Sequence, residues 1–292
     1  MFFKKKKYHF RPDYLSERIL KQKRNFKKKI FISAIFCALL LAAFFYVIFF
    51  SSILKIERVS ILGVNGDQSE NLKEMCLRAM DERIFFGWIG RNNFLFFSEE
   101  KISNQIREKF PELKSVDFQK KIKTRALLVS ISGRDASAVW CPAWFDPSSS
   151  STLTAQPENE KCFFIDEQGF VFQEAPILSG SMFATIFDVS FAGKGLGSTG
   201  LEKSKLDFIL EAKKEIISKN LDLGDFLIRP ESTAEIELLS PDGWRVYLDL
   251  ASSAATQIDS LARALTEEIK EKKNQLEYVD LRVPGRIYYK LK

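Results

Sequence analysis

A glycine-rich run is the first segment whose residue spacing is typical of chemistry. Gly195-Leu196-Gly197-Ser198-Thr199-Gly200 matches G-x-G-x-x-G, follows a predicted strand and precedes a predicted helix. This is the context of a dinucleotide-binding turn. The residues after Gly200, however, predict an antiparallel hairpin and a helix instead of repeated βαβ units. We therefore interpret the run as a loop before the helix and expect no cofactor.

The sequence offers few residues that are suitable for other catalytic or metal chemistry. Ser98-Glu99-Glu100-Lys101 matches the S-x-x-K of penicillin-recognising enzymes, but the sequence lacks their S-D-N and K-T-G elements. We expect Ser98 to be a helix N-cap instead. One His and four Cys leave little for a His-based triad or a zinc site. The sequence predicts no catalytic residue, no metal site and no small-molecule substrate.

The four cysteines divide into two kinds. Cys37 lies in an apolar segment and Cys76 in a predicted amphipathic helix, where both are expected to be small buried hydrophobes. Cys141 and Cys162 flank a polar stretch. A disulfide between them is permitted outside the cytoplasm, and it requires a Cα separation that only the fold sets.

Charge is distributed unevenly along the 292 residues. The formal net charge is +6, while residues 1–29 hold 12 Lys+Arg and 2 acids, so the remaining residues carry 6 − 10 = −4. A basic tail of this kind binds nucleic acid in some proteins. Here it precedes an apolar segment, which favours membrane topology and anionic lipid as the explanation, and no nucleic-acid partner is expected.

Residues 30–54 contain no charged side chain and predict a transmembrane helix. A cleaved signal peptide is the alternative, but its apolar region is shorter and ends at a small-x-small site. The positive-inside rule places the basic tail of residues 1–29 in the cytoplasm and residues 55–292 outside it. We expect a single-pass protein of the cytoplasmic membrane.

The exported part predicts an α+β fold in two domains. Residues 55–134 have the order β-α-α-β-β, with strands at 55–64, 114–120 and 126–132 and helices at 69–80 and 98–110, and predict a three-stranded sheet covered by two helices. Residues 135–292 predict a β-rich domain with two helices, at 201–219 and 254–272. Its strands are expected at 162–172 as a hairpin, 184–191, 233–239, 244–250, 276–283 and 286–291. Residues 142–160 are rich in Ser and Pro and predict a flexible loop.

A loop over residues 83–97 is unusually aromatic. Its six rings are Phe85, Phe86, Trp88, Phe94, Phe96 and Phe97. Core packing is the favoured explanation, and a partner-binding surface is the alternative.

Several short motifs, in this order, resemble the FtsQ/DivIB family of bacterial cell-division proteins. The opening strand at 56–63 (IERVSILG) resembles I-x-x-V-x-V-x-G, Asn92-Asn93-Phe94-Leu95-Phe96 resembles G-x-N-L-F, and residues 165–172 (IDEQGFVF) resemble D-x-x-G-x-V-F. The strongest likeness is terminal, at residues 278–289 (YVDLRVPGRIYY). Residues 133–138 depart from the family's E-R-x-P-x-A because they lack the Glu and the Pro.

The resemblance implies a basic cytoplasmic tail, one membrane helix, a POTRA domain and a β domain. It also implies a non-enzymatic scaffold at the division septum, which joins FtsB/DivIC-like and FtsL-like bitopic proteins and helps control septal peptidoglycan synthesis. In this family a terminal edge strand receives a strand of the FtsB-like partner. The residues that match it here are Arg282, Val283, Gly285, Arg286, Ile287, Tyr288, Tyr289 and Lys290.

Two other functions are weighed against this one. A POTRA-containing export or assembly factor is expected to carry repeated POTRA modules and a barrel, and no series of barrel strands follows here. An extracytoplasmic cell-wall enzyme needs a nucleophile–base pair or a metal-ligand set, which the sequence does not offer.

Overall fold

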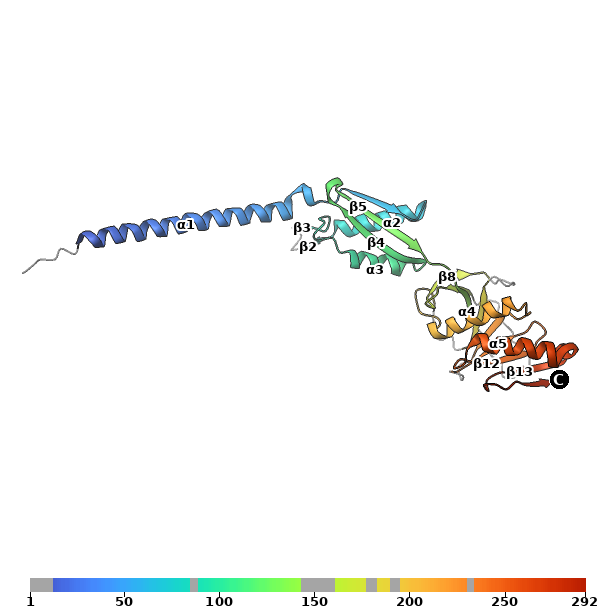
Figure 1. Ribbon diagram of the computed structural model, residues 1–292. Coiled ribbons are helices and arrows are strands. Elements are labelled where there is room, and N and C mark those ends of the chain that lie inside the picture. Colours follow the sequence, from blue (N-terminus) through green and yellow to red (C-terminus); the bar gives the residue numbers. More distant parts are fainter. Residues whose placement is uncertain (1–12, 85–88, 143–160, 177–182, 190–194, 230–233) are drawn as a thin grey trace, which may run out of the picture. The chain divides into compact units, whose positions relative to one another are not determined.

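The computed structural model describes residues 13–84, 89–142, 161–176, 183–189, 195–229 and 234–292 (Figure 1). The architecture is mixed α+β, with an apolar N-terminal helix and a sheet-rich body. The chain divides into two compact units, Met1–Ser60 with Lys73–Ser98 and Gln119–Leu128, and Ile61–Leu72 with Glu99–Phe118 and Val129–Lys292. The predicted domain boundary at residue 134 stays a prediction, and residues 143–160 of the predicted loop lie outside the described residues.

Helix α1 (Asp13–Phe50) contains a segment, Lys21–Phe49, that is long and apolar enough to cross a membrane. It begins well before the predicted span because the basic tail is rich in the good helix formers Lys, Arg, Glu and Leu. The prediction that the helix continues to residue 54 is wrong. Ser51 and Ser52 follow the last turn, and the short 3-10 helix η1 (Ser52–Leu54) replaces it, since serine hydroxyls compete with helical backbone hydrogen bonds.

A three-stranded sheet of order β1-β5-β4 follows α1. Its strands and the two helices between β1 and β4 occur in the predicted order along the chain. The elements are β1 (Arg58–Leu62), α2 (Asp67–Asp81), α3 (Glu99–Lys109), β4 (Leu113–Lys121), the short η2 (Ile122–Thr124) and β5 (Ala126–Gly133). The strand pair β2 (Arg83–Ile84) and β3 (Ile89–Gly90) was not predicted. Alternation buries Leu127, Val129 and Ile131 of β5, as the sequence pattern requires.

The helices of this region bury the stripes that their spacing predicts. Leu72 and Cys76 of α2 and Ile106 of α3 are fully buried. Burial raises the pKa of the Cys76 thiol to about 11, so the group stays neutral and behaves as a small hydrophobe.

The second sheet has nine strands in the order β14-β13-β12-β11-β10-β9-β6-β7-β8. The strands are β6 (Ala138–Pro142), β7 (Cys162–Ile165), β8 (Val171–Ala175), β9 (Ala184–Asp188), β10 (Asp225–Ile228), β11 (Glu235–Leu239), β12 (Arg245–Asp249), β13 (Leu276–Asp280) and β14 (Tyr288–Leu291). Three pairs are parallel (β6 with β9, β9 with β10, β12 with β13), and the other five are antiparallel.

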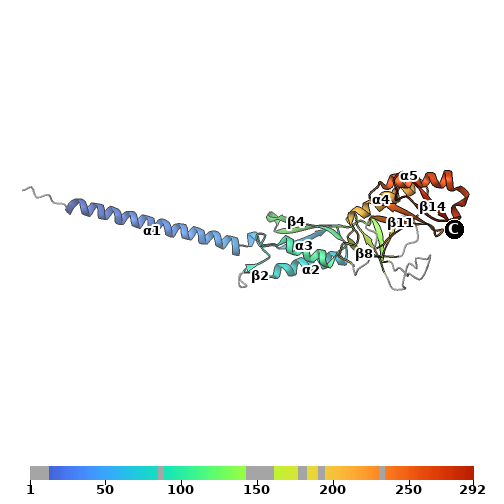
Figure 2. The ribbon, with the colours of Figure 1, turned by 90° about the horizontal axis from the view of Figure 1, so that it is seen from below.

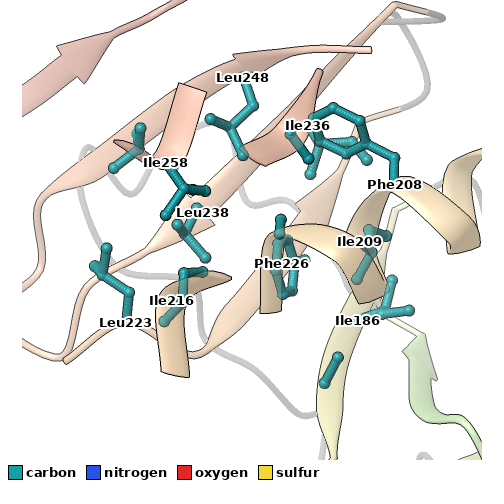
Figure 3. Close-up of a cluster of buried hydrophobic side chains, with 14 of the residues drawn as sticks. Ile186, Phe208, Ile209, Ile216, Leu223, Phe226, Ile236, Leu238, Leu248 and Ile258 are labelled. Atoms are coloured by element: carbon teal, nitrogen blue, oxygen red, sulfur yellow. The ribbon is translucent and has the colours of Figure 1, made fainter. Parts of the chain in front are cut away.

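Helices α4 (Lys203–Ser218) and α5 (Ala254–Arg263) lie on the same side of this sheet in Figure 2. Their apolar side chains meet one face of the strands in the core drawn in Figure 3, where Ile209 and Ile216 of α4 and Ile258 of α5 pack with Phe226 and Leu238. Burial of this one face explains the alternation in β12, where Val246 and Leu248 are buried.

In residues 135–292, strands β6 and β10 were not predicted, and one helix ends earlier than predicted. Strand β10 carries Phe-Leu-Ile buried in succession, which has no period-2 signal. The sequence pattern assigns no strand to residues 138–141 of β6, and the predicted loop begins at the last residue of that strand, Pro142. The predicted helix over 254–272 is wrong beyond Arg263, because the chain continues as the π-helix η3 (Ala264–Ile269) and the 3-10 helix η4 (Lys270–Gln275). The hairpin about Ser240–Gly243 is present, and Gly243 has the predicted positive φ of 83°.

Candidate partner-binding edge

Strand β14 forms one edge of the nine-stranded sheet, and the chain reaches it through a tight turn. The Arg286 amide donates to the Val283 carbonyl (3.1 Å), and Gly285 has a φ of 74°, which glycine adopts without strain. The strand begins only at Tyr288, so the prediction of a strand from residue 286 is wrong by two residues. Arg286 closes the turn and Ile287 follows it, so neither residue pairs in the ladder.

Strand β14 pairs with β13 in an antiparallel register that decides which face each side chain occupies. Tyr289 lies opposite Val279, a fully buried core residue, and Tyr288 lies opposite Asp280. Residues that face each other across a ladder project to the same side of the sheet. Tyr289 therefore projects to the helix-covered face and Tyr288 to the opposite one.

The backbone of β14 has one inner and one outer row of polar groups. The Lys292 amide donates to the Gln275 carbonyl, on the β13 side, at 2.7 Å. Because successive amides along a strand point in opposite directions, the amides of Leu291 and Tyr289 point to the outer edge. Among the described residues, no strand pairs with that edge. The outer row has the geometry that strand addition requires.

Seven of the eight predicted partner residues are exposed, and four of them have large apolar side chains. The exposed fractions are 44% for Val283, 38% for Ile287, 47% for Tyr288 and 44% for Tyr289. The other two side chains at the edge make local contacts: Lys290 forms an ion pair with Glu277 (2.7 Å), and Arg286 donates to the Tyr288 hydroxyl (3.3 Å). The structure thus gathers these residues into one short exposed segment.

Arg282 is the exception, because it is half-buried and its guanidinium is held by side chains of the neighbouring strands. It donates to Asp280 through Nε (2.9 Å) and Nη2 (2.6 Å), donates to Glu235 through Nη1 (2.9 Å), and lies 5.0 Å from the centre of the Tyr247 ring. Hydrogen bonds from Arg282 lower the pKa of Asp280. Arg282 therefore fastens the end of β13 to the neighbouring strands.

The ion pair between Arg282 and Asp280 predicts that the folded protein loses stability in acid. Asp280 has a lowered pKa in the folded protein, so its contribution is full above the ordinary Asp pKa of about 3.9 and is lost as the pH falls through the folded pKa. Denaturant titrations of wild type and Asp280→Asn are expected to differ by a constant amount above about pH 5 and to converge as the pH falls from about 5 towards about 2. A constant difference across that range would contradict this role.

A cavity beside the edge was missed by sequence reasoning. Its volume is about 410 Å³, and one wall is polar: Ser252, Ser253, Thr256, Gln257 and Ser260. The other wall is the segment Leu281, Val283, Pro284, Gly285, Arg286 and Ile287. Hydroxyl residues at three- and four-residue spacing near the start of a predicted helix were the available signal. Only the fold shows that they adjoin the edge.

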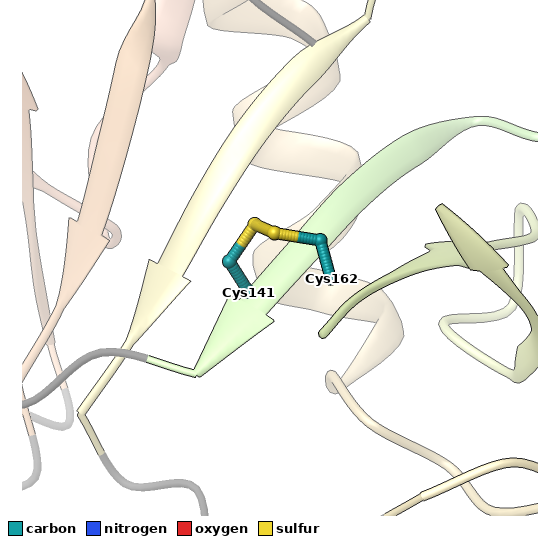
Figure 4. The surroundings of a disulfide bond; sticks show 2 residues. All are labelled: Cys141 and Cys162. Carbon is teal, nitrogen blue, oxygen red and sulfur yellow. A yellow bond between two sulfur atoms is a disulfide. The ribbon is translucent and has the colours of Figure 1, made fainter. Parts of the chain in front are cut away.

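Cys141 of β6 and Cys162 of β7 form a disulfide in the structure (Figure 4). Their Cα atoms are 4.3 Å apart, and both residues are buried among Val139, Ala175 and partly buried phenylalanines. The bridge lies on the sheet face opposite to the main core, because Cys141 alternates with the core residue Trp140.

The glycine-rich run packs locally, and S-x-x-K lies at the start of a helix. Gly197 has a φ of 84° and donates to Val171 (2.9 Å), while a side chain at Gly200 would lie 2.7 Å from the Val171 side chain. The run thus packs on β8, as expected of a loop. Helix α3 begins at Glu99, directly after Ser98. No group of three or more His, Cys, Asp or Glu with metal-binding geometry occurs among the described residues.

Comparison with known proteins adds no further assignment. No protein-family model matches the chain, and no curated protein is significantly similar to it.

Proposed function

We propose that this protein is a non-enzymatic scaffold of bacterial cell division, anchored in the cytoplasmic membrane by α1. Its basic tail would lie in the cytoplasm and its sheets outside, at the division septum. Residues 55–134 would form a POTRA domain and residues 135–292 the β domain. The order of the motifs, the apolar helix and the order of the strands and helices support this proposal.

The exposed edge of β14 carries the proposal. A strand of an FtsB/DivIC-like partner would add to the outer row of β14 and extend the sheet, and an FtsL-like protein would join through that partner. Main-chain hydrogen bonds would supply affinity, while Tyr288 and Tyr289, on opposite faces, would supply specificity. By holding these proteins together, the scaffold would help control septal peptidoglycan synthesis.

Replacement of Tyr289 by two different residues tests this edge. Tyr289→Pro removes an amide donor that points outward, so the native ladder keeps its bonds, as edge strands permit. Tyr289→Ala removes the same ring and keeps the donor. We expect Tyr289→Pro to weaken partner binding at least tenfold more than Tyr289→Ala, because one hydrogen bond is lost and the partner's carbonyl is left unpaired.

The measurement is capture of small bitopic division proteins from detergent-solubilised native membranes by the full-length variants, with mass spectrometry and quantitative titration. Unchanged melting of the variants is the control for folding. Equal binding by the two variants would contradict strand addition. Export or wall-degrading partners in place of division proteins would contradict the proposed function.

A further inference from the structure

The connection between β4 and β5 is a basic tip with an apolar residue at its centre. Residues 119–125 read QKKIKTR, with four cations and no acid. Lys121, Ile122 and Lys123 are all exposed, and Ile122 is 49% exposed. Lysines on either side of an exposed aliphatic side chain match a surface of phosphate groups above hydrocarbon.

Backbone hydrogen bonds hold this tip close to the end of the apolar segment. The Arg125 carbonyl accepts from the amides of Glu57 (2.9 Å) and Arg58 (3.2 Å), and the Arg125 guanidinium also forms an ion pair with Glu57. Glu57 is eight residues beyond Phe49, the last residue of the membrane-length segment of α1.

A second loop of the same compact unit contacts the last turn of α1 directly. The Asn93 side-chain amide donates to the Ile48 carbonyl (2.8 Å), and the Phe96 ring stacks on Phe49 with centroids 5.4 Å apart. Leu95 of this loop is 60% exposed. Both views place the β4–β5 connection near the same end of α1 (Figures 1 and 2).

The structure describes three of the six aromatic residues of the loop over residues 83–97. Phe94 and Phe97 are buried, as core packing predicts, and Phe96 is half-buried against α1. Phe85, Phe86 and Trp88 lie outside the described residues.

We propose that Lys121, Ile122, Lys123 and Leu95 form a membrane-docking surface. It binds anionic phospholipid headgroups of the leaflet from which α1 emerges. The two lysines pair with phosphates, and the two aliphatic side chains enter the interfacial layer. The occupant is lipid because Asn93 and Phe96, which flank Leu95, contact the last turn of the proposed membrane helix. The inference rests on the proposed membrane span of α1 and is independent of the partner at β14.

The test uses the full chain in nanodiscs of phosphatidylcholine, with or without phosphatidylglycerol. A fluorophore on Thr124→Cys, in a Cys37→Ala background, reports contact with a quencher attached to lipid headgroups. The control label is on Ser132→Cys, about 20 Å further along β5. We expect strong quenching at position 124 in anionic discs only, and weak quenching at position 132.

The lysines are tested by Lys121→Ser combined with Lys123→Ser. Each lysine near an anionic surface contributes about fivefold, so the ratio of docked to undocked protein is expected to fall about 25-fold. The matched control, Lys121→Arg with Lys123→Arg, keeps the charge and is expected to keep the quenching. Ile122→Ser is expected to reduce it.

Equal quenching at positions 124 and 132 overturns the proposal. Quenching at position 124 that changes neither with phosphatidylglycerol nor with the lysine substitutions also overturns it. In either case an acidic protein partner becomes the alternative occupant of the tip. A label on Cys37 with a quencher in the acyl chains reports insertion separately. Failure of that signal overturns the membrane span and the docking surface together. Failure at position 124 alone overturns only the docking surface.

Discussion

Arg134→Ala is expected to destabilise the fold by about 4 kcal/mol, because it leaves a buried carboxylate without its ionic partner. The guanidinium forms an ion pair with Asp166, whose side chain is only 4% exposed, and its Nε donates to the Pro111 carbonyl (3.0 Å). Its planar group also lies 4.1 Å from the centre of the Phe170 ring. One side chain thus ties the turn before β4 to the hairpin β7–β8.

A neighbouring ion pair supplies the matched control. Lys114 and Glu167 are 3.0 Å apart between the same two segments, but their side chains are 48% and 60% exposed. Solvent screening limits such a pair to less than about 1 kcal/mol, so Lys114→Ala is expected to cost little. Denaturant unfolding of the full-length variants in detergent, followed by tryptophan fluorescence, gives both values.

A double variant separates the lost ion pair from lost packing. Asp166→Asn removes the charge and keeps an oxygen that can accept from the amides of Gln168 (2.9 Å) and Phe170 (3.0 Å). Arg134→Ala combined with Asp166→Asn is therefore expected to be more stable than Arg134→Ala alone. If Arg134→Ala cost no more than Lys114→Ala, the buried pair would not have this role.

Removal of the Cys141–Cys162 disulfide is expected to cost about 3 kcal/mol. The two residues are 21 positions apart, and closure of a loop of that length restricts the unfolded chain by about this amount. Cys141→Ala combined with Cys162→Ala avoids leaving buried thiols, and its unfolding is compared with that of the oxidised wild type.

Reduction provides the internal control for this prediction. A reductant is expected to destabilise the wild type by a similar amount and to leave the double variant unchanged. Both cysteines are buried, so a reductant reaches the disulfide only when the chain begins to open. The loss of stability is therefore expected to appear under partly denaturing conditions. Equal stability of the double variant and the oxidised wild type would contradict a stabilising bridge.

The sequence by itself determined the local elements. The uncharged stretch after the basic tail predicted a membrane-length helix, and alternation predicted β5 and the β11–β12 hairpin. These signals are local because a helix face or a strand face repeats every few residues. Motif resemblance also predicts residues 282–283 and 285–290 as the partner-binding segment, and this stays a prediction.

Tertiary structure decided how distant segments meet. Strand β10 has no alternation of apolar and polar residues because both of its faces are buried. Strand β6 was not predicted, and it lies directly before a polar segment in the sequence. The pairing of Cys141 with Cys162, the ion pair of Arg282 with Glu235, and the nearness of Ser253 and Thr256 to residues 283–287 depend on which strands become neighbours. Strand order is set by long-range packing of the core, which no local pattern encodes.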